Sequence, residues 1–248
     1  MNLKVLTIIP ARGGSKGVPK KNVKLLAGKP LIVWTLDEVL RAKLAGRVIV
    51  STNNEQIAEV ARDHGAEVPF LRPEEISGDL ATDQEFVIHA LDTLEREEGY
   101  IPDIVARFSP TTPLRTAATI DAAIELLMQN PDVHSVRPIA RLSHHPYKAW
   151  RTEGEYMVPA FSPEVTGHEQ PYNMPRQLFP EMYQHLGASG VAWTKTHREI
   201  GTTSGTILKY VLMDELDAFD INHPLDFDIA EVLMNERIKR DRASNVEL

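Results

Sequence analysis

A run of glycine and basic residues near the N-terminus has the clearest capacity for chemistry in this chain. It reads PARGGSKGVPKKN over residues 10–22 and places Arg12, Lys16 and Lys21 among three glycines. Glycines let the backbone approach a ligand closely, and consecutive N–H groups in such a turn form a concavity for anions. The three cations can offset much of the charge of a triphosphate. Because the spacing is neither that of a P-loop nor G-x-G-x-x-G, we expect a phosphate-binding loop of another kind.

The elements before and after this loop place it where ligands bind. Residues 3–9 form a short apolar run that predicts a buried strand, and the alternation of strand-like and helix-like segments continues to about residue 140. Further strands are expected at 48–50, 68–71, 104–108 and 133–139, and helices at 30–44, 55–64, 83–96 and 120–128. This order predicts an α/β fold with a doubly wound, mostly parallel, Rossmann-like sheet. Ligands bind such sheets at the carboxyl ends of the strands, which is where the loop at 10–22 begins.

The alternation stops after residue 140, which divides the chain. We expect a nucleotide-binding part of a single α/β domain at 1–140 and a protruding lid or dimerisation excursion at 141–183. The excursion is rich in proline and too long for a simple connection. Residues 184–240 return to the α/β domain with a strand at 207–213 and a helix at 225–238, and 241–248 form a polar tail.

Composition excludes several function classes. The 248 residues carry a net charge of -8 and no cysteine, so non-specific nucleic-acid binding, disulfides and thiolate chemistry are not expected. No apolar run approaches the length of a membrane span, and the N-terminus lacks the pattern of a secretion signal. We therefore expect a cytoplasmic protein without a membrane partner. A basic cluster at 12–24 in an acidic chain favours a small anionic ligand.

The order of the motifs along the chain resembles the CMP-acylneuraminate (CMP-sialic acid) synthetases, a nucleotidyltransferase family. The loop at 10–22 is similar to the family's signature. The other matching segments are VSTN with IAE at 50–59, LRPEE at 71–75, SPTTPLR at 109–115, HHPYK at 144–148, PRQLFP at 175–180 and DINHPLDF at 220–227. The resemblance covers about residues 3 to 235 and rests on the order and spacing of these segments.

The resemblance implies a reaction and a set of site residues. An acceptor hydroxyl of an acidic sugar attacks the α-phosphorus of CTP, and pyrophosphate leaves. Implied catalytic residues are Arg12, Lys21 and Asp220, and implied nucleotide-binding residues are Ala11, Gly13, Gly14, Ser15, Lys16, Asn22, Arg72 and Thr82. Implied acceptor-binding residues are Ser109, Lys148, Arg176 and Gln177, with Asp220 and Asn222 holding Mg²⁺. The resemblance also implies a homodimer formed through 141–183, and it identifies no general base.

Three residues depart from the family pattern. The family usually has Gln at Ser109, Asn at Leu186 and Asp at Asn222. Asparagine can still bind Mg²⁺ through its carbonyl oxygen, but it removes one negative charge. The acceptor could therefore be a sialic, legionaminic, pseudaminic or Kdo-like acid, or a different anion.

Other interpretations of the same residues were weighed. A nucleotidyltransferase for another acceptor and a non-catalytic nucleotide-binding relative stay open, the latter because of Asn222. A dehydrogenase is disfavoured by the glycine spacing, and Ser189 lacks the G-x-S-x-G setting of a hydrolase. The acidic residues at 79–85 are interpreted as a helix start, and the histidines at 144–145 as part of a lid.

Overall fold

The computed structural model of the chain describes residues 3–14 and 16–244 and divides into two compact units. Unit 1 holds the chain up to Ile139 and from His185 onward, and unit 2 is Ala140–Gln184. None of the helices described has both the length and the apolar character that a bilayer-spanning helix needs.

Unit 1 is built on one mixed, mostly parallel sheet, which confirms the predicted α/β fold class. Its strands are β1 (Val5–Pro10), β4 (Arg47–Ser51), β5 (Ile104–Arg107), β6 (Ser135–Arg141), β10 (Gly190–Trp193) and β11 (Leu208–Leu212). Their order is β11-β6-β10-β5-β1-β4, and β9 (Tyr183–His185) also pairs with β6. β1 runs parallel to β4 and β5, and β11 runs parallel to β6. Only β10 of these strands is antiparallel to both its neighbours, β5 and β6.

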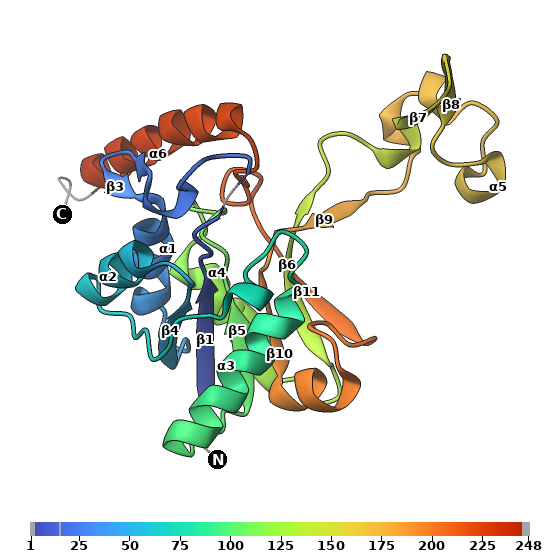
Figure 1. Cartoon of the computed structure of the whole chain (residues 1–248). Helices are drawn as coiled ribbons and strands as arrows, with labels where there is room; N and C mark the ends of the chain where they lie inside the picture. Colours follow the sequence, from blue (N-terminus) through green and yellow to red (C-terminus); the bar gives the residue numbers. More distant parts are fainter. Residues whose placement is uncertain (1–2, 15, 245–248) are drawn as a thin grey trace. The chain divides into compact units, whose positions relative to one another are not determined.

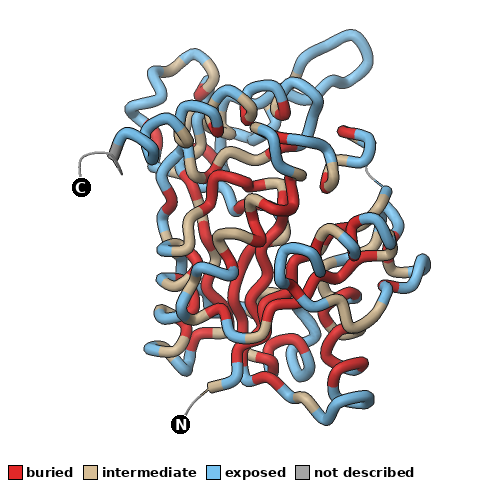
Figure 2. The backbone as a smooth tube through the Cα atoms, turned by 90° about the vertical axis from the view of Figure 1, so that its left-hand side faces the viewer, coloured by how far each residue is buried: buried red, intermediate tan, exposed pale blue. Residues whose placement is uncertain are grey.

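Alternate side chains of each central strand enter two different cores, one on each face of the sheet. In β1, Val5 and Ile9 pack with α1 (Leu31–Arg41), α2 (Glu55–Asp63) and α4 (Ala117–Met128). Leu6 and Ile8 pack on the other face, with α3 (Asp83–Glu98), as the helices in Figure 1 show. The central strands β1, β4, β5 and β10 are buried along nearly their whole length, and Figure 2 shows the buried core of the chain.

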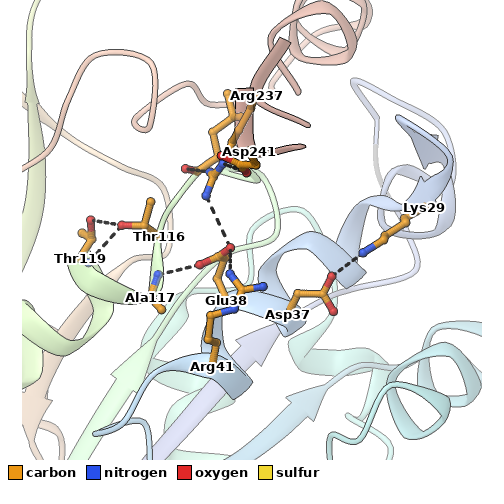
Figure 3. Close-up of polar contacts among 10 residues, drawn as sticks. Lys29, Asp37, Glu38, Arg41, Thr116, Ala117, Thr119, Arg237 and Asp241 are labelled. Carbon is orange, nitrogen blue, oxygen red and sulfur yellow. Dashed lines mark hydrogen bonds and ion pairs between the residues drawn. The ribbon is translucent and has the colours of Figure 1, made fainter. Parts of the chain in front are cut away.

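The last helix, α6 (Pro224–Ser244), covers a third core beside the loop at 10–22. Its residues Phe227, Ala230 and Met234 pack with Val18 and Leu26, the latter on the small hairpin of β2 (Leu25–Leu26) and β3 (Lys29–Pro30). A polar contact set then ties α6 to α1 and to the start of α4 (Figure 3).

The hub of that contact set is Glu38 of α1. Its carboxylate accepts a hydrogen bond from the Ala117 backbone N–H at 2.8 Å and from Arg41 at 2.7 Å, and it lies 3.6 Å from the Arg237 guanidinium. The Arg237 side chain also donates to the Leu114 carbonyl oxygen at 2.7 Å. These bonds hold α6 in place, and through it the turn at 220–223 that precedes it.

Three sequence predictions are wrong in detail. Residues 68–71 form no strand. Glu67, just before them, makes an isolated bridge with Ile49. Pro69 has no N–H to donate, and Phe70 instead packs edge-on against His89 of α3 at 4.8 Å. Strand β10 was not predicted, because four residues after a glycine-rich turn give too little periodicity.

The third error concerns the tail. Helix α6 continues to Ser244 instead of ending near 238, so the residues at 240–244 are helical. Ion pairs within the helix, from Glu236 to Lys239 at 2.7 Å and from Arg237 to Asp241 at 3.9 Å, support its last turns.

Unit 2 is a small body of short elements. A hairpin joins β7 (Trp150–Glu153) to β8 (Tyr156–Pro159), followed by α5 (Pro163–Thr166). The 3₁₀ turns are η3 (Pro146–Lys148), η4 (Pro171–Asn173) and η5 (Arg176–Leu178) here, and η1 (Lys21–Val23) and η2 (Glu74–Ile76) in unit 1, where Thr196–Ile200 is a π-helix. Phe179 forms the centre of unit 2, with the rings of His145 and Tyr147 at 4.8 and 5.5 Å.

Candidate functional site

A cleft of about 260 Å³ lies at the carboxyl ends of β1 and β5 in unit 1. It brings together six of the residues singled out in the sequence: Arg12, Gly14, Lys21, Asn22, Arg72 and Ser109. It also includes residues that were not assigned to the site, namely Asp79, Asp83, Phe86, Thr111 and Ala188. The strand-end location predicted for the loop at 10–22 is thus the location that the fold gives it.

The backbone of the loop at 10–22 is fixed by the turn after β4. The Ala11 N–H donates to the Ser51 carbonyl oxygen at 3.0 Å, and the Gly13 N–H donates to Asn53 Oδ1 at 2.8 Å. A side chain at Gly17 would place its Cβ 2.2 Å from the Asn222 carbonyl oxygen. Gly17 therefore allows the loop to touch the turn that carries Asp220 and Asn222.

Three cations of the loop are engaged by protein groups. Arg12 forms an ion pair with Asp79 at 2.9 Å, and Lys16 pairs with the other oxygen of the same carboxylate. Lys21 donates from Nζ to the Ile221 carbonyl oxygen at 2.8 Å. Burial lowers the pKa of Lys21 and Arg12 adds to this, whereas Asp220 and Asp226 oppose it.

Asn22 and Ala11 have structural positions in the same loop. Asn22 is buried, and its Nδ2 donates to the Arg12 carbonyl oxygen at 3.0 Å. Ala11 is buried in the core beneath the loop and does not line the cleft. Ser15 lies outside the described residues.

Arg72 forms a charged, buried part of the cleft wall. Its Nε donates to Ser51 Oγ at 3.0 Å and its Nη2 to the Ser51 carbonyl oxygen at 2.5 Å. The guanidinium lies 4.8 Å from the centre of the Phe86 ring. Burial lowers the pKa of Arg72 to about 10, against the effect of Asp83, so the side chain stays charged at neutral pH. A cation beside an aromatic ring at the cleft is suited to a planar, polar group.

On the other side of the cleft, Arg115 joins two loops. Its guanidinium reaches the Ser109 carbonyl oxygen at 3.4 Å and donates to Ser189 Oγ at 2.8 Å. The residue is 2% exposed, and burial lowers its pKa to about 10. Ser109 and Ala188 both line the cleft, so Arg115 positions this wall from behind. Sequence reasoning missed this role because nothing in the SPTTPLR segment marks its arginine as buried.

Asp220 and Asn222 lie in one turn but do not form a complete metal site. Asn222 Nδ2 donates to Asp220 Oδ2 at 3.0 Å, and Thr112 Oγ1 lies 3.4 Å from Asp220 Oδ1. Asp226 fixes the turn by accepting the Asn222 and His223 backbone N–H groups at 2.9 and 2.7 Å. Among the described residues no three His, Cys, Asp or Glu side chains group as metal ligands. One carboxylate still fits Mg²⁺ when substrate phosphates supply further ligands, the usual case for nucleotide enzymes.

Thr82 caps helix α3 and does not itself line the cleft. Its hydroxyl and backbone N–H contact the Glu85 carboxylate at 2.8 and 2.5 Å in a capping box. The helix-start interpretation therefore holds for Thr82 and Glu85. It holds for Asp83 as well, which is the first residue of α3 and also lines the cleft. Asp79 lies before the helix and lines the cleft.

The remaining acceptor candidates lie in unit 2. Lys148 is on η3, and Arg176 and Gln177 are on η5, all three exposed. Arg176 donates to the Ser143 carbonyl oxygen at 3.4 Å. They belong to a different compact unit from the residues of the cleft.

Comparison with known proteins decides the family. A sequence model of cytidylyltransferases matches residues 6–159. The chain belongs to the cytidylyltransferase family. It is 34% identical over 239 residues to CMP-N,N'-diacetyllegionaminic acid synthase of Legionella pneumophila, covering 94% of this chain and 97% of the relative.

Two further comparisons describe the range of this similarity. An N-acylneuraminate cytidylyltransferase of Escherichia coli is 29% identical over 237 residues, which are 96% of this chain and 54% of that protein. This chain thus spans about half the length of the E. coli protein but nearly all of the Legionella protein. Its fold is similar to the structure of CMP:2-keto-3-deoxy-manno-octonic acid synthetase complexed with CTP, with a TM-score of 0.66, 14% identity, and coverage of 94% of this chain and 99% of that one.

The contact between Gly17 and Asn222 leads to a stability prediction. We expect Gly17→Ala to lower the free energy of unfolding by about 1–3 kcal/mol, because the new Cβ would overlap a backbone oxygen in a packed turn. Gly14→Ala is the matched control, since a Cβ there meets nothing within 4 Å. Thermal melting of the two variants measures the effect, and equal melting temperatures would contradict the close contact.

Proposed function

We propose that this cytidylyltransferase transfers CMP from CTP to an acidic sugar of the sialic acid type and releases pyrophosphate. The observation that carries the proposal is the cleft at the ends of β1 and β5. There the glycine loop, Lys21 and Arg72 concentrate positive charge in a protein of net charge -8. Family membership supports the nucleotide, and the names of the relatives, which refer to legionaminic and N-acylneuraminic acids, support the acceptor class.

The chemistry asks for positioning and charge stabilisation rather than covalent catalysis. The acceptor hydroxyl forms a bond to the α-phosphorus of CTP as the bond to the pyrophosphate oxygen breaks, and the hydroxyl proton passes to solvent or a base. Arg12 and Lys21 offset charge on the transferred and departing phosphates, together with Lys16. Asn22 keeps the loop backbone in place by its hydrogen bond to the Arg12 carbonyl oxygen. Arg72 is the residue that we assign to the cytosine ring of CTP.

The acceptor is assigned to the side of the cleft that Arg115 organises. Ser109 is a short polar side chain there, where a longer one would take up more of the cleft. In unit 2, considered by itself, Lys148 and Arg176 carry the charge that suits a carboxylate and Gln177 carries an amide, and the family resemblance assigns these three residues to the acceptor.

A bound Mg²⁺ is part of the proposal and would neutralise charge on the phosphate oxygens. Asp220 would hold it, with Asn222 able to contribute its Oδ1 if the amide turns from its present bond to Asp220. Lys21, which lies against the same turn through the Ile221 carbonyl, would share the neutralisation.

The test is pyrophosphate release with Mg²⁺, crossing CTP, UTP, GTP and ATP against sialic, legionaminic, pseudaminic and Kdo-type acids. We expect release with CTP and one of these acids, because the cleft combines a triphosphate loop with an anion-binding wall. Release with a different nucleotide would contradict the cytidylyl assignment. No release on any pair, with CTP still raising the melting temperature, would leave a nucleotide-binding protein with another acceptor or none.

Arg12→Ala provides the matched loss of function. It removes one cation from the loop, so we expect turnover to fall by a factor of about 100 or more with the melting temperature little changed. Arg62→Ala is the control, because Arg62 pairs with Glu55 on the surface of α2. Full activity of a folded Arg12→Ala protein would remove the loop from the site.

Asn222→Asp tests the metal assignment. A second carboxylate next to Asp220 adds negative charge, so we expect half-maximal activity at a Mg²⁺ concentration several-fold lower, with similar activity at saturating metal. The measurement is activity against Mg²⁺ concentration for both proteins. Superimposed curves would show that residue 222 is not near the metal.

A homodimer formed through unit 2 completes the proposal. Unit 2 exposes several large apolar side chains in the single chain: Tyr156, Met157, Val165 and Leu178. Light scattering of the wild-type protein should give twice the chain mass of 27.8 kDa. The double variant Met157→Glu with Val165→Glu should have the mass of one chain, because the charges oppose burial of this surface. A wild-type protein with the mass of a single chain would refute the dimer.

A further inference from the structure

Asp79 forms ion pairs with the same two cations that the proposed function assigns to the phosphates. One carboxylate oxygen pairs with Arg12 at 2.9 Å and the other with Lys16. Asp79 lines the cleft together with Arg12 and Lys21, so its carboxylate lies within the space that a ligand would enter. Hydrogen bonds from Lys16 and Arg12 hold the pKa of Asp79 below its usual range, so it is an anion at neutral pH.

The segment that carries Asp79 is anchored at both ends, and a turn in its middle bonds the Ala81 N–H to the Gly78 carbonyl oxygen at 3.3 Å. Before it, Ser77 Oγ donates to the Pro73 carbonyl oxygen at 2.8 Å, and after it the capping box fixes Thr82 to helix α3. Between these points, a Cβ at Gly78 would meet nothing within 4 Å, and Leu80 is 95% exposed. Packing therefore does not hold Asp79 in place, and its ion pairs are its principal contacts.

We propose that Asp79 is an internal competitor for the phosphates, which holds Arg12 and Lys16 when no nucleotide is bound and is displaced by it. The inference rests on the proposed function, because it requires the phosphates to bind these two cations. A carboxylate and a phosphate cannot share them fully, since two anions in one site repel each other. Asp79 thus lowers the affinity for the nucleotide, and does so more for ligands that place more negative charge on the loop.

An alternative role for Asp79 predicts the opposite change in nucleotide affinity when the carboxylate is removed. If the carboxylate orients Arg12 and Lys16 for the phosphates, then removing it weakens binding. The direction of the change in Kd therefore separates a competitor from a positioning residue.

The experiment measures Kd for CTP, CDP and CMP by calorimetry with the full chain in Mg²⁺ buffer. The proteins are wild type, Asp79→Asn and the control Glu75→Gln. Glu75 is an exposed carboxylate of the preceding η2 turn, so its variant matches the change in net charge. We expect Asp79→Asn to lower Kd for CTP by roughly three- to tenfold, as for the loss of one partly exposed ion pair and one largely exposed ion pair. The gain should be smaller for CDP and smallest for CMP, and Glu75→Gln should match wild type.

The outcomes that overturn the proposal are distinct from those that support it. An unchanged or higher Kd for CTP in Asp79→Asn overturns it and leaves the proposed function intact. So does an equal gain for all three nucleotides, or an equal gain in Glu75→Gln, because either shows a general charge effect. If wild type and both variants fail to bind CTP, the proposed function and this inference fail together.

Discussion

Positive charge gathered at one edge of the sheet is the constraint on which the site depends. Arg12, Lys21 and Arg72 share one cleft; burial lowers the pKa of Lys21 and of Arg72, and Arg12 adds to the fall in both. Such a set is stable only if each cation has an acceptor, and the chain supplies three kinds. Arg12 has the Asp79 carboxylate, Lys21 has a backbone carbonyl, and Arg72 has Ser51. The loops around the cleft are shaped by these contacts, and an entering polyanion would replace part of them.

The scaffold keeps the cations of the loop close to the cleft because it fixes the backbone of the loop. The loop at 10–22 is bonded to the turn after β4 through Ser51 and Asn53, and it touches the turn before α6 at Gly17. α6 is in turn tied to α1 by Glu38 and Arg237. The contact between Arg237 of α6 and Glu38 of α1, which Figure 3 shows, therefore helps to hold the helix that follows the turn of Asp220.

Sequence reasoning found the parts of the site that have local signals. The loop at 10–22 combines glycines, cations and a preceding strand within one segment, and the cleft contains it. Asp79 could not be found this way, because its partners Arg12 and Lys16 are distant in sequence and its neighbours suggest a helix cap. The same limit applies to the fold: β10 is defined by pairing with β5 and β6, and its own four residues carry little pattern. Long-range pairing and buried charge leave weak traces in local periodicity.

Buried charge also explains why Asp220 matters to the protein itself. Arg115 is buried, and its hydrogen bonds within the described part of the chain go to Ser109 and Ser189 rather than to a carboxylate, which costs several kcal/mol unless other groups stabilise the charge. The negative charge of Asp220 opposes the fall in the pKa of Arg115, and it does the same for Lys21. One carboxylate thus favours the charged form of two cations, Lys21 at the cleft and Arg115 behind the wall formed by Ser109 and Ala188.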